Sequence, residues 1–102
     1  MSTYLHVTLE VNAAGMRRFV EVMSEVVAIM EGNGWKLAGA FIQRTGRLNT
    51  VIDLWELESF DHFDRALQAF RKHPRFPEIK AALDETVISE TIVFADRAPY
   101  MR

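Results

Sequence analysis

Side chains that could do chemistry lie close together in the run GRLNTVIDLWELESF, between Gly46 and Phe60. Asn49, Asp53 and Trp55 supply an amide, a carboxylate and an indole at odd-numbered positions of one predicted strand, so they share a face. Strand interiors disfavour Asp. We therefore expect Asp53 to pair with an arginine of a partner chain or to face a pocket. In a pocket, loss of water would raise its pKa and suit it to act as a general base.

Two further polar residues could join this chemistry. His6 could carry a proton near neutral pH, while Gln43 and Asn49 could hold a carbonyl or enolate oxygen. Each candidate also has a structural interpretation: Asn49 suits a turn, Trp55 suits a dimer interface, and a lone His6 is incidental. No second ligand accompanies His6, so we expect no metal and no cofactor. His62 and His73 are predicted at the surface.

Composition limits the class of protein. The chain has 102 residues, enough for one domain over residues 1–102, with a net charge of -2 and no cysteine. No block of Lys and Arg follows any segment, which argues against a nucleic-acid partner. No apolar run approaches the roughly 20 residues of a membrane helix, and no secretory signal is visible at the N-terminus. We expect a cytoplasmic protein without a membrane span.

Hydrophobic periodicity predicts the elements. Alternation predicts strands, three- and four-residue spacing predicts helices, and Asn12 and Ser59 are suited to cap the helices that follow them. The order β-α-β-β-α-β predicts an α+β, ferredoxin-like fold with both helices on one face of a four-stranded antiparallel sheet. Residues 95–102 are predicted to be a loose tail. The expected strands are 3–11, 35–44, 48–57 and 86–94; the expected helices follow Asn12 and Ser59, with a short one over 77–83.

The two faces of the sheet are assigned from an expected hairpin. A three-residue loop, Thr45–Arg47, would pair Gly39 with Asp53 and Leu37 with Trp55. The face under the helices would then carry Leu5, Val7, Leu9, Ala38, Ala40, Ile42, Ile52 and Leu54. The helix-free face would carry Tyr4, His6, Thr8, Leu37, Gly39, Phe41, Gln43, Asn49, Val51, Asp53 and Trp55.

The helix-free face would carry many large apolar side chains, so we predict that another protein surface covers it. Burying a Trp, Phe, Leu or Val side chain is favourable by about 1.5–3 kcal/mol. A second copy of the chain, packed sheet against sheet, is the simplest cover and predicts a homodimer. The polar side chains within that interface predict a cavity. We expect Tyr4, Phe41, Gln43, Asn49 and Trp55 to contact a ligand there, with His6 and Asp53 as candidate catalytic residues.

The same stretch resembles the NIPSNAP family. The shared pattern is a Gly-aromatic strand, a Gly-x-Leu-Asn turn and a Leu-Trp followed by Glu-Ser, and His73 to Leu83 is similar to the family's second-helix extension. The matching residues are Gly39, Phe41, Gly46, Leu48, Asn49, Leu54, Trp55, Glu58 and Ser59. The resemblance implies the dimeric α/β-barrel superfamily, which includes cofactor-free monooxygenases, small isomerases and haem-handling enzymes. The family's Glu-x-Arg pair near Tyr4 to His6 is absent, so no site built on that arginine carries over.

Two functions fit these expectations. The first is a NIPSNAP-like homodimer that binds a small hydrophobic or amphipathic molecule in the barrel without turnover. The alternative is a cofactor-independent monooxygenase or isomerase for an aromatic or polyketide-like substrate, with His6 or Asp53 abstracting a proton. A weaker third interpretation is a purely structural dimer. The first is favoured because the sequence offers no identifiable acid–base pair.

Overall fold

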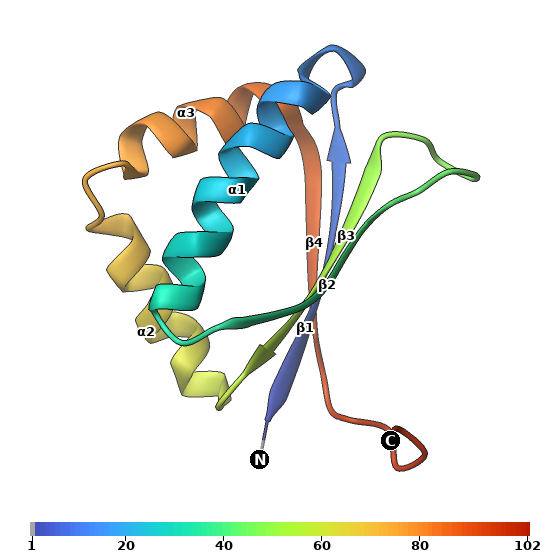
Figure 1. Ribbon diagram of the computed structural model, residues 1–102, viewed down its shortest axis with the longest axis vertical. Coiled ribbons are helices and arrows are strands. Elements are labelled where there is room, and N and C mark those ends of the chain that lie inside the picture. The colour runs from blue at the N-terminus through green and yellow to red at the C-terminus, as the bar shows by residue number, and fades with distance from the viewer. Residues whose placement is uncertain (1) are drawn as a thin grey trace.

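A twisted antiparallel sheet with every helix on one of its faces makes up the fold (Figure 1). The computed structural model describes residues 2–102. The predicted ferredoxin-like plan is confirmed, with one added helix before the last strand. The elements are β1 (Thr3–Val11), η1 (Ala13–Gly15), α1 (Met16–Gly32), β2 (Lys36–Ile42), β3 (Thr50–Leu57), α2 (Phe60–Arg71), α3 (Phe76–Thr86) and β4 (Val87–Ala95).

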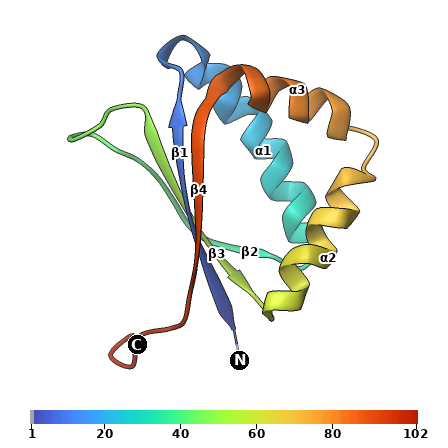
Figure 2. The same cartoon turned by 180° about the vertical axis from the view of Figure 1, so that it is seen from behind.

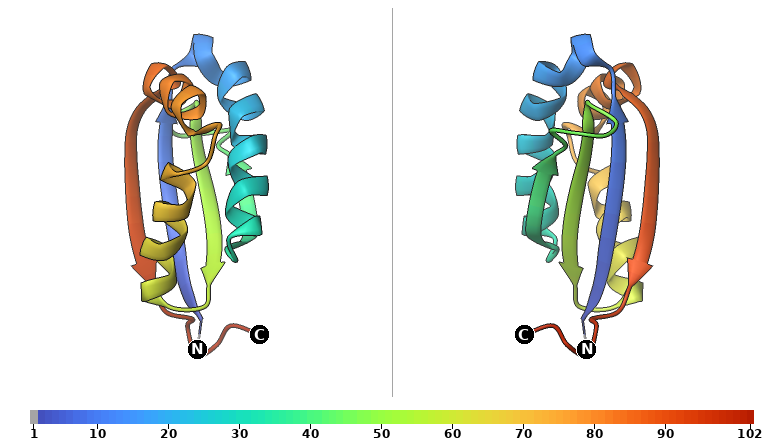
Figure 3. Two further views of the ribbon diagram at one scale, coloured as in Figure 1. Left: turned by 90° about the vertical axis from the view of Figure 1, so that its left-hand side faces the viewer. Right: turned by 90° about the vertical axis from the view of Figure 1, so that its right-hand side faces the viewer.

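The first strand is the centre of the sheet. Strand order is β2-β3-β1-β4, so β1 pairs with β3 on one side and β4 on the other. The predicted alternation of β1 is confirmed, because Leu5, Val7, Leu9 and Val11 are buried. Figure 2 shows β4 at the near edge in a view from behind, and Figure 3 separates the helix-covered face from the helix-free face.

Caps start the helices where the sequence predicts them. The Asn12 side chain accepts from the Ala14 backbone amide, and the Ser59 side chain accepts from the His62 amide at 3.3 Å. The short helix predicted over 77–83 is longer: α3 runs to Thr86, whose hydroxyl donates to the Ala82 carbonyl. Within residues 2–102, none of the helices has the length and apolarity needed to cross a membrane.

The face assignment of β3 is wrong. Leu5 pairs with Trp55, Val7 with Asp53 and Leu9 with Val51, and directly paired residues of antiparallel strands share a face. Because Leu5, Val7 and Leu9 are buried under the helices, Val51, Asp53 and Trp55 are buried there too. Ile52 and Leu54 take the opposite, helix-free face. The prediction assumed that polar side chains would turn away from the helices.

The predicted hairpin register is also partly wrong. Leu37 does pair with Trp55, but Gly39 then pairs with Leu54 rather than Asp53, because β2 contains one extra residue at Ala38. This β-bulge brings Leu37 to the helix side, contrary to prediction, while Ala40 remains there as expected. The connection is longer than three residues, since β2 ends at Ile42 and β3 starts at Thr50.

His62 is buried, not at the surface as predicted. Its Nε2 donates to the Asn33 carbonyl at 2.7 Å, which joins the start of α2 to the turn after α1. Gly34 in that turn has a φ of 96°, and a Cβ added there would lie 2.5 Å from the His62 ring. Glycine is therefore required for this close approach.

Candidate functional site

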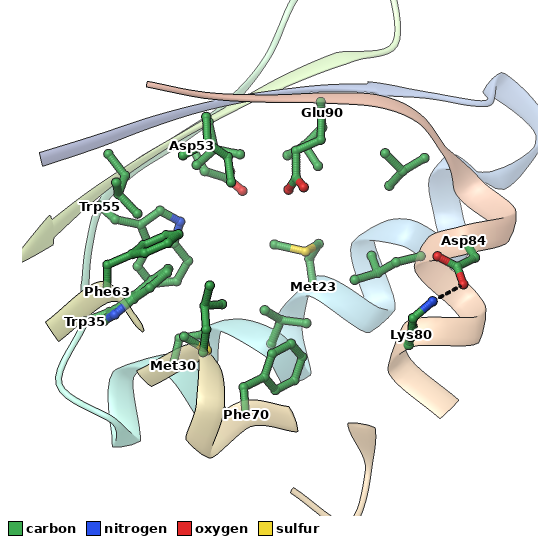
Figure 4. A pocket seen from close by; sticks show the side chains of 18 of the residues that line it. Met23, Met30, Trp35, Asp53, Trp55, Phe63, Phe70, Lys80, Asp84 and Glu90 are labelled. Atoms are coloured by element: carbon green, nitrogen blue, oxygen red, sulfur yellow. Dashed lines mark hydrogen bonds and ion pairs between the residues drawn. The ribbon is translucent and has the colours of Figure 1, made fainter. Parts of the chain in front are cut away.

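A cavity of about 620 Å³ lies between the helices and the sheet. Figure 4 shows side chains from both layers pointing into it, with the sheet above and α1 and α2 below. Its buried inner end is formed by residues of β1, β3 and α1, whereas its exposed lining residues come from the end of α2, from α3 and from β4. The mouth therefore opens between the last two helices and the edge strand.

Aromatic rings form the inner end of the cavity. The Trp35 and Trp55 rings meet edge to face with centroids 5.4 Å apart, and Phe63 stacks on Trp35 at 5.5 Å. Phe63 also contacts Phe94 on β4, so the aromatic contacts continue to the edge strand. Trp55 is two residues after Asp53 on the same face of β3. This places an indole next to a carboxyl.

Asp53 is the most unusual residue of the cavity. Only 5% of its surface is exposed, and among residues 2–102 no hydrogen bond is found to its carboxyl, whose oxygens reach the open space of the cavity. Desolvation by burial, together with the smaller effect of the nearby Glu90 carboxylate, raises its pKa from 3.8 to about 6. Asp53 therefore changes its charge close to neutral pH.

Glu90 supplies a second carboxyl from β4. Leu9 pairs with Glu90 and Val7 pairs with Asp53, so the two acids flank β1 on the same face. Figure 4 shows both carboxyl groups directed into the cavity from the sheet. Glu90 is exposed as a whole residue, yet partial desolvation raises its pKa as well. Together the acids give the cavity a polar, acidic roof.

Charged residues also surround the mouth. Lys80 and Asp84 lie one helical turn apart on α3 and form an ion pair at 2.7 Å. Arg71 lines the mouth from the end of α2. All three residues are exposed. Water screens such charges strongly, so their influence on the buried Asp53 is small.

A second cavity, of about 480 Å³, lies on the other side of Asp53. It is lined mainly by apolar residues of α1, β2 and β3, including Val20, Phe41 and Val51. Met23 and Asp53 line both cavities. These two residues therefore lie between the two cavities.

The cavity brings together two of the seven residues singled out from the sequence, Asp53 and Trp55. Tyr4 and His6 lie on the helix-free face, where they pair with Glu56 and Leu54. Phe41 is also exposed on that side, where its ring lies over Gly39, and it is among the residues that line the second cavity.

The remaining two of those seven are in the connection between β2 and β3. The Asn49 carbonyl accepts from the Val11 amide, and its φ of 60° is a left-handed conformation that Asn tolerates well. The Gln43 amide nitrogen of the backbone donates to the Thr50 carbonyl, and its side-chain oxygen is buried without a hydrogen bond. Neither residue lines the 620 Å³ cavity.

Several lining residues were not predicted to face a cavity. Met23, Met30, Trp35, Phe63 and Glu90 were not identified as candidates. Met23 and Met30 could have been found from their spacing on the buried face of α1. Glu90 could be found only from its register with β1, because its neighbours along β4 do not distinguish it. Within residues 2–102, no three His, Asp or Glu side chains come together as metal ligands would.

Comparisons with known proteins are consistent with this architecture. The model of the NIPSNAP family matches residues 4–94 of the chain. No curated protein matches the sequence of this chain. A NIPSNAP domain protein from Burkholderia xenovorans is 18% identical, with a TM-score of 0.82 and coverage of 100% of this chain and 99% of that one. A NIPSNAP family protein from Agrobacterium tumefaciens is 17% identical, with a TM-score of 0.87 and coverage of 98% and 96%.

The fold is also found in an enzyme. SnoaB, a cofactor-independent oxygenase from Streptomyces nogalater, has a TM-score of 0.68 at 16% identity, with coverage of 98% of each chain. At this identity the two chains share a fold, and the comparison assigns no activity to this one.

Proposed function

The chain belongs to the NIPSNAP family, and from this premise we propose that it binds a small hydrophobic or amphipathic molecule in the cavity between helices and sheet. The observation that carries the proposal is the nearly buried Asp53 carboxyl, which has no partner among residues 2–102 and faces a chamber walled by aromatic rings. The volume of about 620 Å³ lies in the range of small-molecule sites in proteins.

Stability alone does not account for Asp53. A carboxyl that faces a cavity and is largely removed from water is partly desolvated, which disfavours its charged form, and a β-branched aliphatic residue would fill this strand position more favourably. The aromatic rings beside it are held by contacts with one another rather than by collapse onto the acid. A ligand that donates a hydrogen bond or a charge to Asp53 would remove the penalty, which supports binding as the role of the cavity.

Proton abstraction is the second candidate function, and the pKa of Asp53 favours it. A carboxyl with a pKa of about 6 is largely ionised at neutral pH but more basic than an ordinary aspartate. It could take a proton from an acidic C–H or O–H group of a bound aromatic molecule and leave an enolate or phenolate. His6 cannot share this step in the same chamber, since it lies on the opposite face of the sheet.

The helix-free face supports association with a second copy. Phe41 and Val93 are about half exposed there, at 57% and 47%, and Ile52 and Leu54 lie between them on the sheet. The family resemblance implies that a second sheet packs on this surface. We propose a homodimer with the two sheets face to face. Analytical ultracentrifugation that detects only an 11.7 kDa species at micromolar concentrations would contradict it.

The binding proposal can be tested with the protein's own fluorescence. Both tryptophans of the chain line the cavity, so a bound molecule should change their emission directly. We expect saturable quenching by the neutral probe N-phenyl-1-naphthylamine. Leu67→Phe, which narrows the cavity, should weaken binding about tenfold, a loss of about 1.4 kcal/mol.

Leu48→Phe is the matched control. It makes the same substitution on an exposed loop residue that does not line the cavity, so affinity should not change. Absence of saturable binding in the wild-type protein, or equal weakening by both variants, would contradict the proposed site.

A further inference from the structure

We infer that the cavity selects an organic cation, a hydrophobic amine whose ammonium group lies against Asp53 and Glu90 while its apolar body lies against Trp35 and Trp55. This inference rests on the proposed binding function and names the chemical class of the ligand.

The two acids form a site for positive charge. Asp53 is 95% removed from solvent, enters the chamber and accepts no hydrogen bond from residues 2–102. Glu90 enters from the other side of β1 and faces the same space. The two carboxylates repel each other when both are ionised, and a cation between them would relieve the repulsion.

Within the part of the chain that the structure describes, no basic side chain pairs with Asp53 or Glu90. Of the cavity-lining residues within the range 2–102, the basic ones are Arg71 and Lys80, and both are exposed at the mouth. The Lys80 ammonium is already paired with Asp84. Figure 4 shows Lys80 and Asp84 near α3, apart from Asp53 and the tryptophans. The inner chamber is therefore acidic, and an anionic ligand would be repelled from it.

The aromatic rings complete the site. Trp55 follows Asp53 on the same strand face, and its ring is packed against Trp35. Faces of Trp and Phe rings attract ammonium groups, most strongly where water is excluded. The carboxyls and indoles therefore favour the same ligand class. Met23 and Met30 line the chamber opposite the acids and offer an adaptable apolar surface to the rest of the molecule.

Three probes with one shared apolar body test this inference: 4-phenylbutylamine, 4-phenylbutanol and 4-phenylbutanoate, titrated at neutral pH by tryptophan fluorescence and calorimetry. We expect the amine to bind about tenfold more tightly than the alcohol, and the carboxylate to bind least. Asp53→Asn should remove most of the amine's advantage and leave affinity for the alcohol within twofold. Glu90→Gln should reduce the amine's advantage partially. It is the second variant, and it changes an exposed residue of β4.

Asp64→Asn is the matched control, because it removes a carboxylate from an exposed position of α2 outside the cavity. It should leave all three affinities unchanged. Equal binding of amine and alcohol, or tightest binding of the carboxylate, would overturn the inference while leaving the proposed binding function intact. No saturable response to any of the three probes would overturn the inference, and the same result together with no saturable binding of N-phenyl-1-naphthylamine would overturn both.

Discussion

Polar residues on the two faces of the same sheet differ in their burial. On the helix-covered face, Asp53 lies between Val7 and Ala40 and is almost completely removed from water. On the helix-free face, His6 lies between Leu54 and Val93 and is exposed. The residue type alone would favour His6 as a proton carrier at neutral pH. Burial reverses that order, because desolvation alters the pKa of Asp53 and leaves it in a chamber that can hold a molecule.

The largest expected effect is on the free energy of unfolding, and it is seen by comparing a core residue with a residue on the opposite face of the sheet. Leu5→Ala removes a side chain that is 1% exposed on the covered face, and it should lower the free energy of unfolding by about 3 kcal/mol. Leu54→Ala makes the same change on the helix-free face, next to His6, and should cost about 1 kcal/mol in the monomer. Urea denaturation measures both.

Protein concentration sharpens this test. If a second copy covers the helix-free face, the loss caused by Leu54→Ala should grow as concentration rises, because dissociation then contributes to unfolding. Equal losses at both positions in dilute protein would show that the two faces do not differ in burial as described.

Asp53→Asn should stabilise the protein by about 2 kcal/mol above pH 6.5, because an ionised carboxylate no longer has to be buried. The unfolded chain releases this proton near pH 3.8, whereas the folded protein retains it to about pH 6. Wild-type stability therefore falls as pH rises through this window. The gain in the variant should disappear below about pH 4, where the wild-type carboxyl is also neutral.

Chemical denaturation at a series of pH values gives this result directly. Asp64→Asn, at an exposed position, should show no comparable pH-dependent gain. A variant that is less stable than the wild type at every pH would mean that Asp53 makes a stabilising interaction with its surroundings.

The smallest expected effect is that of His6→Ala. His6 is exposed on the face opposite the cavity, so its removal should change stability by less than about 0.5 kcal/mol. Binding of 4-phenylbutylamine should also remain within twofold of the wild type. A large loss of binding, measured by fluorescence titration, would move the ligand site to the helix-free face.

Local signals in the sequence were sufficient for the elements. Alternation in β1 leaves a single apolar face, and Ser59 precedes a helix with an acidic residue, Asp61, in its first turn. Each of these features depends on residues near one another in the chain. The element order then follows, and with it the ferredoxin-like plan.

The faces of β3 could not be predicted in the same way. Both of its faces contain large apolar residues, with Val51 and Trp55 on one and Ile52 and Leu54 on the other. The expected three-residue loop decided the prediction, because it grouped the polar side chains of the hairpin on one face, apart from the small aliphatic ones. That grouping fails here because the helix-covered side contains a cavity that accepts a carboxyl. The grouping of Asp53 with Glu90 depends on two registers with β1, which no local pattern contains.

The extra residue at Ala38 affects how β2 would respond to the loss of one residue. In a regular strand, deletion of one residue turns every side chain on one side of the gap to the opposite surface. Here Leu37 and Ala40 already lie on the helix side with Ala38 and Gly39 between them, so deletion of Ala38 would leave a regular strand with both in place. The chain can thus lose a residue from β2 without disturbing the wall that contains Asp53.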